Sequence, residues 1–168
     1  MDPRSCYDEG KRVCEMLIYE YARAYNLDCK IVRLFNTYGL KMTLDDGRVI
    51  TNWIGWILEG LSVRIYGSVE QTISFCYITD MLEGLVKMMS SLELGPINLG
   101  NDTCEFTLNE LVEVFERVLR RKVLVEYLSG KQDDPKVRKP VLDKARDKLN
   151  FKCVIGLDEG IRETCNWI

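Results

Sequence analysis

The sequence predicts an α/β fold, because helical and strand-like patterns alternate along its 168 residues. Residues 11–25 have the apolar spacing of a helix, and residues 29–35 follow as a short apolar run typical of a buried parallel strand. Later, residues 107–119 show helical spacing and residues 122–127 alternate like a strand. A helix followed by a buried strand is half of a right-handed βαβ unit, so we expect layered sheet and helix.

Helix, strand, loop and helix are expected in that order in the first part of the chain. Asn26 is expected to end the helix at 11–25, and the strand at 29–35 follows it. Polar residues 39–47 predict a loop, and helical spacing returns at residues 49–59. No strand-like run precedes the first helix, so we expect the other half of this βαβ unit to lie outside the sequence.

Short strands and one helix are expected in the middle of the chain. Residues 63–66, 75–78 and 96–99 are short apolar runs typical of strands. A helix is predicted at residues 80–90, and Thr79 is expected to cap its first turn because a hydroxyl oxygen can accept a free backbone N–H.

The clearest helix start in the sequence is a capping box formed by Thr107 and Glu110. Beyond that helix, Val123, Val125 and Tyr127 alternate and predict a strand with one buried face. The last expected elements are a charged loop at 130–140 and helices at 142–149 and 158–168.

Composition excludes several classes of protein. A hydrophobic content of 46% suits a globular core, and a net charge of -3 argues against a nucleic-acid binder, which would usually show a basic face. No apolar run approaches the roughly 20 residues that span a bilayer, and the first residues are charged and polar, unlike a signal peptide. We therefore expect an intracellular protein.

The numbers of cysteine and histidine residues limit the catalytic chemistry that this chain can carry out. Seven scattered cysteines without a Cys-x-x-Cys motif indicate buried free thiols in a reducing compartment, and neither a disulfide scaffold nor a zinc site. The absence of histidine excludes Ser-His-Asp and Cys-His triads. Acid–base chemistry must then use Tyr, Lys, Asp, Glu or Cys.

Tyr7 and Lys11 are the first candidates for that chemistry. They are four residues apart, so they share one face of a helix that begins near Ser5. A phenol has an ordinary pKa of about 10, and a neighbouring ammonium group favours its ionised form, which can act as a base. The alternative is chance, because many helices carry Tyr and Lys at this spacing.

Several further stretches accompany this pair. They are Ser-Cys-Tyr-Asp-Glu-Gly-Lys-Arg at 5–12 and Arg-Leu-Phe-Asn-Thr-Tyr-Gly at 33–39, followed by residues 45–49, 66–68, 97–101 and 133–140. In this order they resemble the extended short-chain dehydrogenase/reductase family, and within it the UDP-glucuronate decarboxylases (UDP-xylose synthases). The resemblance implies the C-terminal part of a doubly wound Rossmann fold followed by a small substrate-binding domain.

The resemblance also implies how the chain divides. Residues 1–48 would be a remnant of the Rossmann domain with the Tyr-x-x-x-Lys helix and the next strand, and 49–168 mainly the substrate-binding region. The Gly-x-x-Gly-x-x-Gly turn that holds the dinucleotide pyrophosphate in such enzymes does not occur in this sequence. We therefore expect the N-terminal dinucleotide-binding half to be missing, and weak or no turnover by the isolated chain.

The implied reaction is the NAD-dependent conversion of UDP-glucuronate to UDP-xylose and CO2. Hydride leaves C4 of the sugar, the tyrosine accepts the O4 proton, and the 4-keto sugar loses its carboxylate before hydride returns. By resemblance, Tyr7 and Lys11 are catalytic. The resemblance assigns cofactor contacts to Tyr7, Lys11, Thr37 and Arg48, and substrate contacts to Tyr7, Asn36 and Arg138. For Arg48 alone, solvation at the surface is the alternative.

Three departures from the family pattern concern the expected site. Ile73 stands where the family has an arginine near the substrate, and isoleucine cannot pair with an anion. Thr43 stands where a histidine often contacts cofactor, and Gly-Leu-Lys-Met at 39–42 replaces Gly-Pro-Arg-Met.

Several readings of the resemblance stay open. The enzyme could be a related nucleotide-sugar 4,6-dehydratase or 4-epimerase, the chain could be a non-catalytic subunit, or the sequence could be a truncated gene model. Full-length relatives dimerise through the tyrosine-bearing helix, so a homodimer or pairing with a full-length homologue is expected. A cytoplasmic location is expected, or a Golgi membrane if an N-terminal anchor has been lost.

Overall fold

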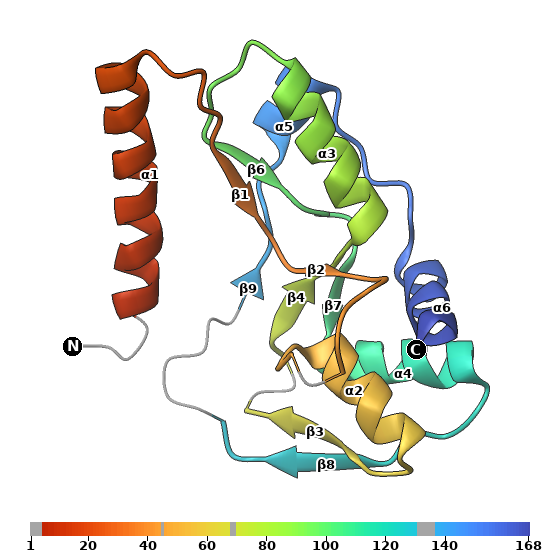
Figure 1. The fold of residues 1–168 in the computed structure, drawn as a ribbon. Coiled ribbons are helices and arrows are strands. Elements are labelled where there is room, and N and C mark those ends of the chain that lie inside the picture. The colour runs from red at the N-terminus through yellow and green to blue at the C-terminus, as the bar shows by residue number, and fades with distance from the viewer. Residues whose placement is uncertain (1–4, 45, 68–69, 131–136) are drawn as a thin grey trace.

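Parallel strand pairs and the helices that cover them build the protein (Figure 1). The computed structural model describes residues 5–44, 46–67, 70–130 and 137–168. The helices are α1 (Ser5–Tyr25), α2 (Val49–Leu58), α3 (Ile78–Ser90), α4 (Leu108–Leu119), α5 (Asp143–Leu149) and α6 (Leu157–Trp167). The strands are β1 (Val32–Leu34), β2 (Thr37–Tyr38), β3 (Val63–Tyr66), β4 (Thr72–Ser74), β5 (Cys76–Tyr77), β6 (Ile97–Leu99), β7 (Glu105–Thr107), β8 (Val125–Leu128) and β9 (Val137–Arg138). The predicted α/β class is confirmed.

The pairing of the strands brings distant parts of the sequence together. β1 pairs with β6, β2 with β5 and β3 with β8, all in parallel. In the fourth sheet, β4 lies between antiparallel β7 and parallel β9. In the second pair Thr37 lies opposite Cys76, and in the fourth sheet Ile73 lies opposite Arg138.

Two clusters of buried apolar side chains hold the elements together. The larger one unites α2, α4, α6 and strand β3, with Trp53 and Phe115 among its largest members. The smaller one packs α3 and α5 against β6, and includes Met81 and Phe151. The chain passes from one cluster to the other more than once, and its division at residues 48 and 49 stays a prediction.

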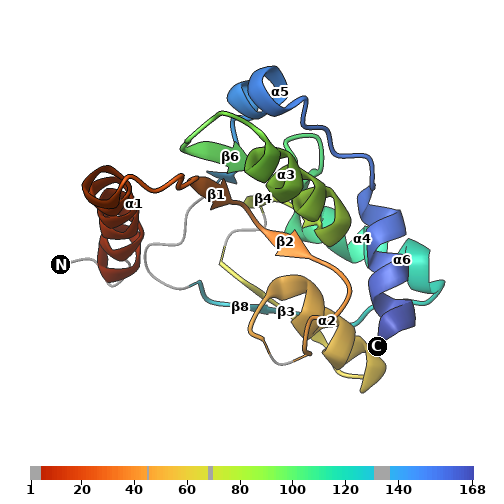
Figure 2. The same cartoon turned by 45° about the horizontal axis from the view of Figure 1, so that its top comes forward.

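Helix α1 stands apart from both clusters, as Figures 1 and 2 show from two directions. Its apolar side chains Val13, Leu17 and Tyr21 are exposed. Glu15 joins it to β1 through two contacts of 2.6 Å with the Arg33 guanidinium, which lowers the pKa of that carboxyl group. The helix ends where Asn26 adopts a left-handed φ of 52°, which confirms the predicted stop.

The capping box at Thr107 is confirmed, whereas the cap predicted at Thr79 is wrong. The Thr107 side chain accepts the Glu110 N–H at 3.2 Å, and Glu110 accepts the Thr107 N–H at 2.7 Å. Helix α3 instead begins after Tyr77, which makes no side-chain cap, so Thr79 lies inside its first turn. Asp80 and Met81 are buried in that turn, and Asp80 accepts the Val154 and Ile155 N–H groups at 3.1 Å, a contact with a distant segment that no local capping pattern encodes.

Two further sequence predictions need correction. Tyr127 was expected on a buried strand face. Among the described residues, however, β8 pairs with β3 alone, and the Tyr127 ring is exposed and donates its O–H to Asn109. All seven cysteines are free, as predicted, but of the seven only Cys76 is fully buried. Cys6 and Cys14 are exposed because α1 is not packed into a core, and the other four are half-buried.

Helices α4 and α6 are joined by a two-point ion pair whose effect depends on pH. Arg117 contacts both carboxylate oxygens of Asp158, at 2.6 and 2.9 Å, and this lowers the pKa of Asp158 below its ordinary 3.8. The contribution is present above that ordinary value and is lost as the pH falls through the lowered pKa. We expect Arg117→Gln to reduce the urea midpoint slightly at pH 7 and less at pH 3.

The matched control for that measurement is Asp158→Asn, which removes the titrating group. In the Asp158→Asn background, Arg117→Gln should have the same effect on the urea midpoint at both pH values. A pH-dependent difference that persists there would assign the effect to another group.

Candidate active site

A cavity of about 980 Å³ opens between α1, the ends of β1 and β4, and α2. Its lining includes Tyr7, Lys11, Asn36, Thr37 and Arg48, which are the predicted site residues whose side chains the structure describes. Those five residues are not part of the lining of a second cavity, of about 450 Å³, beside α5.

Tyr7 and Lys11 face this cavity from one side of α1. Their four-residue spacing places the Lys11 Nζ 5.4 Å from the centre of the Tyr7 ring, as the helical pattern predicts. The Tyr7 side chain is 64% exposed, so its hydroxyl is open to a ligand. A ligand in the cavity can therefore bring an exchangeable proton to this pair.

Asn36 and Thr37 lie where β1 ends and β2 begins. The Phe35 N–H donates to the Leu99 carbonyl at 2.9 Å, and the Cys76 N–H donates to the Asn36 carbonyl at 2.8 Å. The Thr37 hydroxyl donates to the Phe35 carbonyl at 2.8 Å. These bonds fix both residues just beyond the carboxyl end of β1, the end of a parallel strand at which open α/β sheets bind ligands.

Arg48 immediately precedes α2. The backbone N–H of Arg48 donates to Asp46 Oδ1 at 3.0 Å, and its guanidinium lies 3.7 Å from Asp46 Oδ2 and 3.4 Å from the Thr37 carbonyl. Its side chain is largely exposed, which leaves guanidinium donors available to an anion. Arg33, by contrast, is engaged by Glu15.

Two of the three sequence departures lie outside the cavity. Thr43 is exposed, and neither Thr43 nor Lys41 lines the cavity. Ile73 does line it, half-buried, and its other contacts are with the larger core cluster. Ile73 is therefore the departure that changes the charge of this cavity.

Arg138 belongs to a strand, although a charged loop was predicted there. β9 pairs with β4, and the backbone of Arg138 lies opposite that of Ile73 at the cavity wall. Such a two-residue pairing depends on a distant partner and leaves no periodicity in the sequence. The rest of the predicted loop includes residues 131–136, which lie outside the described residues.

The cavity also contains residues that the sequence reasoning missed. Arg64 and Tyr66 line it from β3, and the Arg64 guanidinium lies 5.5 Å from the Trp56 ring centre and 3.4 Å from Glu126. The strand at 63–66 was predicted, and its alternation puts Arg64 and Tyr66 on one face. That alternation was the signal that could have identified them.

This lining suits a ligand that combines negative charge with ring systems. Lys11, Arg48 and Arg64 supply positive charge, while Trp53 and Phe75 supply apolar and aromatic surface. Within the described residues, no group of three or more Cys, Asp and Glu side chains could hold a metal ion. Across the same residues, no helix has the length and apolarity to cross a membrane.

The fold and this cavity define a class: an α/β protein of the Rossmann type with a Tyr-x-x-x-Lys pair facing a cationic pocket. Residues 1–100 match the model of the NAD dependent epimerase/dehydratase family. The chain belongs to this family.

The chain is also similar to individual proteins whose names are known. The chain is 43% identical over 158 residues to UDP-glucuronic acid decarboxylase 6 of Arabidopsis thaliana, covering 94% of this chain and 46% of the relative. It is 38% identical to UDP-glucuronic acid decarboxylase 1 of Danio rerio, covering 98% and 39%. The solved UDP-N-acetylglucosamine 4-epimerase of Methanobrevibacter ruminantium superposes with a TM-score of 0.90 at 30% identity, covering 99% and 54%. The chain thus spans about half the length of these proteins or less.

Proposed function

We propose that this chain carries the catalytic Tyr–Lys pair and nucleotide-sugar contacts of an NAD-dependent UDP-glucuronate decarboxylase. The observation that carries the proposal is the single cavity that brings together Tyr7, Lys11, Asn36, Thr37 and Arg48. The decarboxylase names of relatives about 40% identical support the choice of reaction. The positive charge of the cavity supports an anionic nucleotide sugar as substrate.

The chain's own residues have separable tasks in this proposal. Tyr7 takes the proton from O4 of the sugar, and the positive charge of Lys11 stabilises the phenolate that accepts it. When bound, NAD supplies the acceptor for the C4 hydride. The resulting C4 ketone lies β to the carboxylate, so the electrons of the breaking C–C bond flow into that carbonyl and CO2 leaves.

Lys11 also takes part in binding. Together with Thr37 and Arg48 it would hold the cofactor, through ammonium, hydroxyl and guanidinium groups that line the cavity. Asn36 would orient the sugar from the strand end, and Arg138 would contact the diphosphate. The roles of Asn36 and Arg138 follow from the family resemblance. That of Arg138 is also supported by the position of its backbone opposite Ile73.

The test is to incubate the purified chain with NAD and with UDP-glucuronate labelled in the carboxyl carbon. Released CO2 is trapped, and the mass of the sugar-nucleotide product is measured by mass spectrometry. Labelled CO2 with UDP-xylose supports the decarboxylase. An isomer of unchanged mass would indicate a 4-epimerase. A 4,6-dehydratase removes a hydroxyl group from C6, which UDP-glucuronate lacks, so a parallel incubation with UDP-glucose tests for that activity by loss of water. If the chain binds UDP but forms no product, its role would be limited to binding.

Two copies of the chain are proposed to pair through α1. The support is that Val13, Met16, Leu17 and Tyr21 expose apolar surface along this helix, which would be costly in water. Sedimentation should show a dimer that Leu17→Lys weakens, whereas Met89→Lys at an exposed position of α3 should leave the dimer intact. A wild-type monomer at micromolar concentration would contradict homodimerisation. Mixing with a full-length homologue then tests pairing in trans.

A cytoplasmic location is proposed for the chain, as the sequence led us to expect. Fractionation of cells that express the chain at native levels would test it. Recovery in the Golgi membrane fraction would contradict it.

Ile73→Arg is expected to tighten binding of UDP to the cavity by about tenfold or more, because a charge-assisted hydrogen bond contributes roughly 1.5–3 kcal/mol. Titration calorimetry with UDP measures the change in Kd, and circular dichroism verifies the fold because Ile73 also packs on the core. Ile73→Gln provides a polar control without charge. Equal tightening by Ile73→Gln would show that charge is not the cause.

A further inference from the structure

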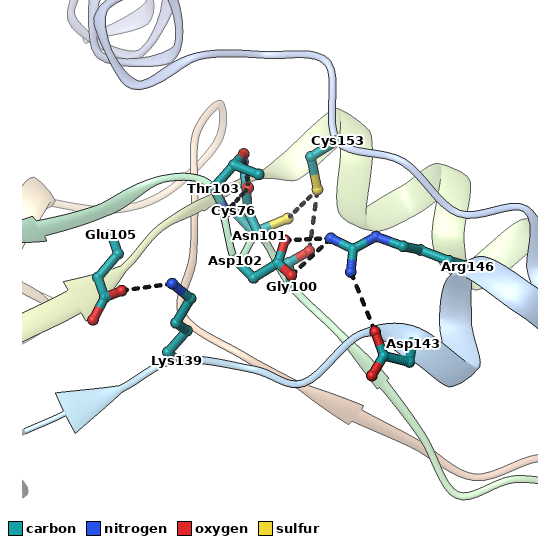
Figure 3. A network of polar contacts seen from close by, with 10 residues as sticks. All are labelled: Cys76, Gly100, Asn101, Asp102, Thr103, Glu105, Lys139, Asp143, Arg146 and Cys153. Carbon is teal, nitrogen blue, oxygen red and sulfur yellow. Dashed lines mark hydrogen bonds and ion pairs between the residues drawn. The ribbon is translucent and has the colours of Figure 1, made fainter.

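Two cysteine sulfurs meet inside the protein, away from the candidate active-site cavity. Cys76 Sγ lies 3.8 Å from Cys153 Sγ, and the Cys153 thiol donates to the Gly100 carbonyl at 3.1 Å (Figure 3). Both cysteines are free thiols. The Cys76 thiol donates to the Tyr77 carbonyl at 3.7 Å, and either sulfur can be the donor in the close contact between the two cysteines.

The two thiols come from segments separated by 77 residues and are held in place independently. Cys76 is in β5, whose pairing with β2 fixes its backbone. Cys153 is in the connection between α5 and α6, where the Val154 and Ile155 N–H groups both donate to the buried Asp80 at 3.1 Å. Each sulfur is thus held beside the other by its own backbone anchor.

The two sulfurs differ in their access to solvent. Cys153 is half-buried and borders the cavity of about 450 Å³ together with Asn101, Asp102 and Arg146. Cys76 is fully buried, and its hydrogen bond with Cys153 and its burial raise the pKa of its thiol. A small oxidant therefore reaches the Cys153 sulfur first, and the Cys76 sulfur lies behind it.

We propose that Cys76 and Cys153 form a reversible disulfide when the protein meets a peroxide. The proposal is independent of the proposed decarboxylase function. The sulfurs must close from 3.8 Å to about 2.05 Å, a small movement for a connection without regular secondary structure.

The chemistry balances with hydrogen peroxide as the oxidant. The Cys153 sulfur attacks one peroxide oxygen, the O–O bond breaks, and Cys153 becomes a sulfenic acid while the leaving hydroxide takes up the thiol proton as water. The Cys76 sulfur then attacks Cys153 Sγ, the S–O bond breaks, and the leaving hydroxide takes the Cys76 proton as a second water. Two thiols are oxidised and one peroxide is reduced to two waters.

The bond would be positioned to influence the candidate active site. Cys76 lies opposite Thr37 in the β2–β5 pair, and its N–H holds the Asn36 carbonyl. A disulfide would tie this strand pair to the α5–α6 connection. Thr37 and Asn36, which are hydrogen-bonded to β5, would then be linked through that strand to the α5–α6 connection.

The experiment treats the purified chain with hydrogen peroxide, blocks the remaining thiols with an alkylating reagent, and maps linked peptides by mass spectrometry. We expect a peptide pair joining Cys76 to Cys153, reversed by dithiothreitol. Dilute protein and a non-reducing gel separate this internal link from links between chains through the exposed Cys6 and Cys14.

Variants decide between this pair and its neighbours. Cys104 also interacts with Cys153, so Cys104→Ser must retain the 76–153 link. Cys153→Ser must abolish it and leave Cys76 reduced, while Cys165→Ser serves as a matched control that retains it. A link between Cys104 and Cys153, or oxidation of Cys153 to a sulfinic acid with Cys76 still reduced, would overturn the proposal.

Discussion

Replacing Tyr7 by phenylalanine is expected to slow the weak CO2 release from UDP-glucuronate that we expect of this chain by about 100- to 10,000-fold, the usual contribution of a general base. Tyr7→Phe removes one oxygen and keeps the ring that faces the cavity and Lys11. Binding should therefore survive while proton transfer from O4 is lost. Trapping of labelled CO2 measures the rate, and calorimetry with UDP verifies that the cavity still binds nucleotide.

Tyr19→Phe is the matched control, because Tyr19 is on the same helix and is similarly exposed but is not part of the cavity lining. It should leave the rate of CO2 release unchanged. An equal loss in both variants would point to a general effect on α1. A Tyr7→Phe chain that releases CO2 at the wild-type rate would contradict the role proposed for this hydroxyl.

Local patterns in the sequence predicted much of the fold. The strand at 63–66 has the predicted bounds, and the capping box at Thr107 starts its helix as expected. Such elements are encoded within one turn or one run of residues. Strands β4 and β9 each need a distant partner for their short pairing, and no local pattern encodes that partner.

The candidate site was predicted for a different reason. Periodicity placed Tyr7 and Lys11 on one helical face, but only the family resemblance connected them with Thr37 and Arg48. The structure brings the four into one cavity because the Glu15–Arg33 ion pair joins α1 to β1 and the Arg48 guanidinium lies 3.4 Å from the Thr37 carbonyl. Arg64 was not among the predicted site residues: alternation places it on one strand face with Tyr66, and the fold shows that this face borders the cavity.

Trp53 links stability to the site, because its side chain belongs both to the larger core cluster and to the wall of the cavity. It is only 1% exposed, and its ring lies 5.8 Å from that of Phe115 on α4. Trp53→Ala is expected to lower the free energy of unfolding by about 3–5 kcal/mol, since it removes buried apolar surface and leaves a void. That is a large part of the roughly 5–15 kcal/mol that keeps a domain folded.

Urea unfolding followed by circular dichroism measures this loss, with Trp167→Ala as the matched control. Trp167 is 54% exposed near the end of α6, so its removal should change the free energy of unfolding by about 0.5 kcal/mol or less. Equal losses in both variants would mean that α2 is not packed on α4 as described. A loss confined to Trp53→Ala would establish that one tryptophan supports both the core and the wall against which a nucleotide would bind.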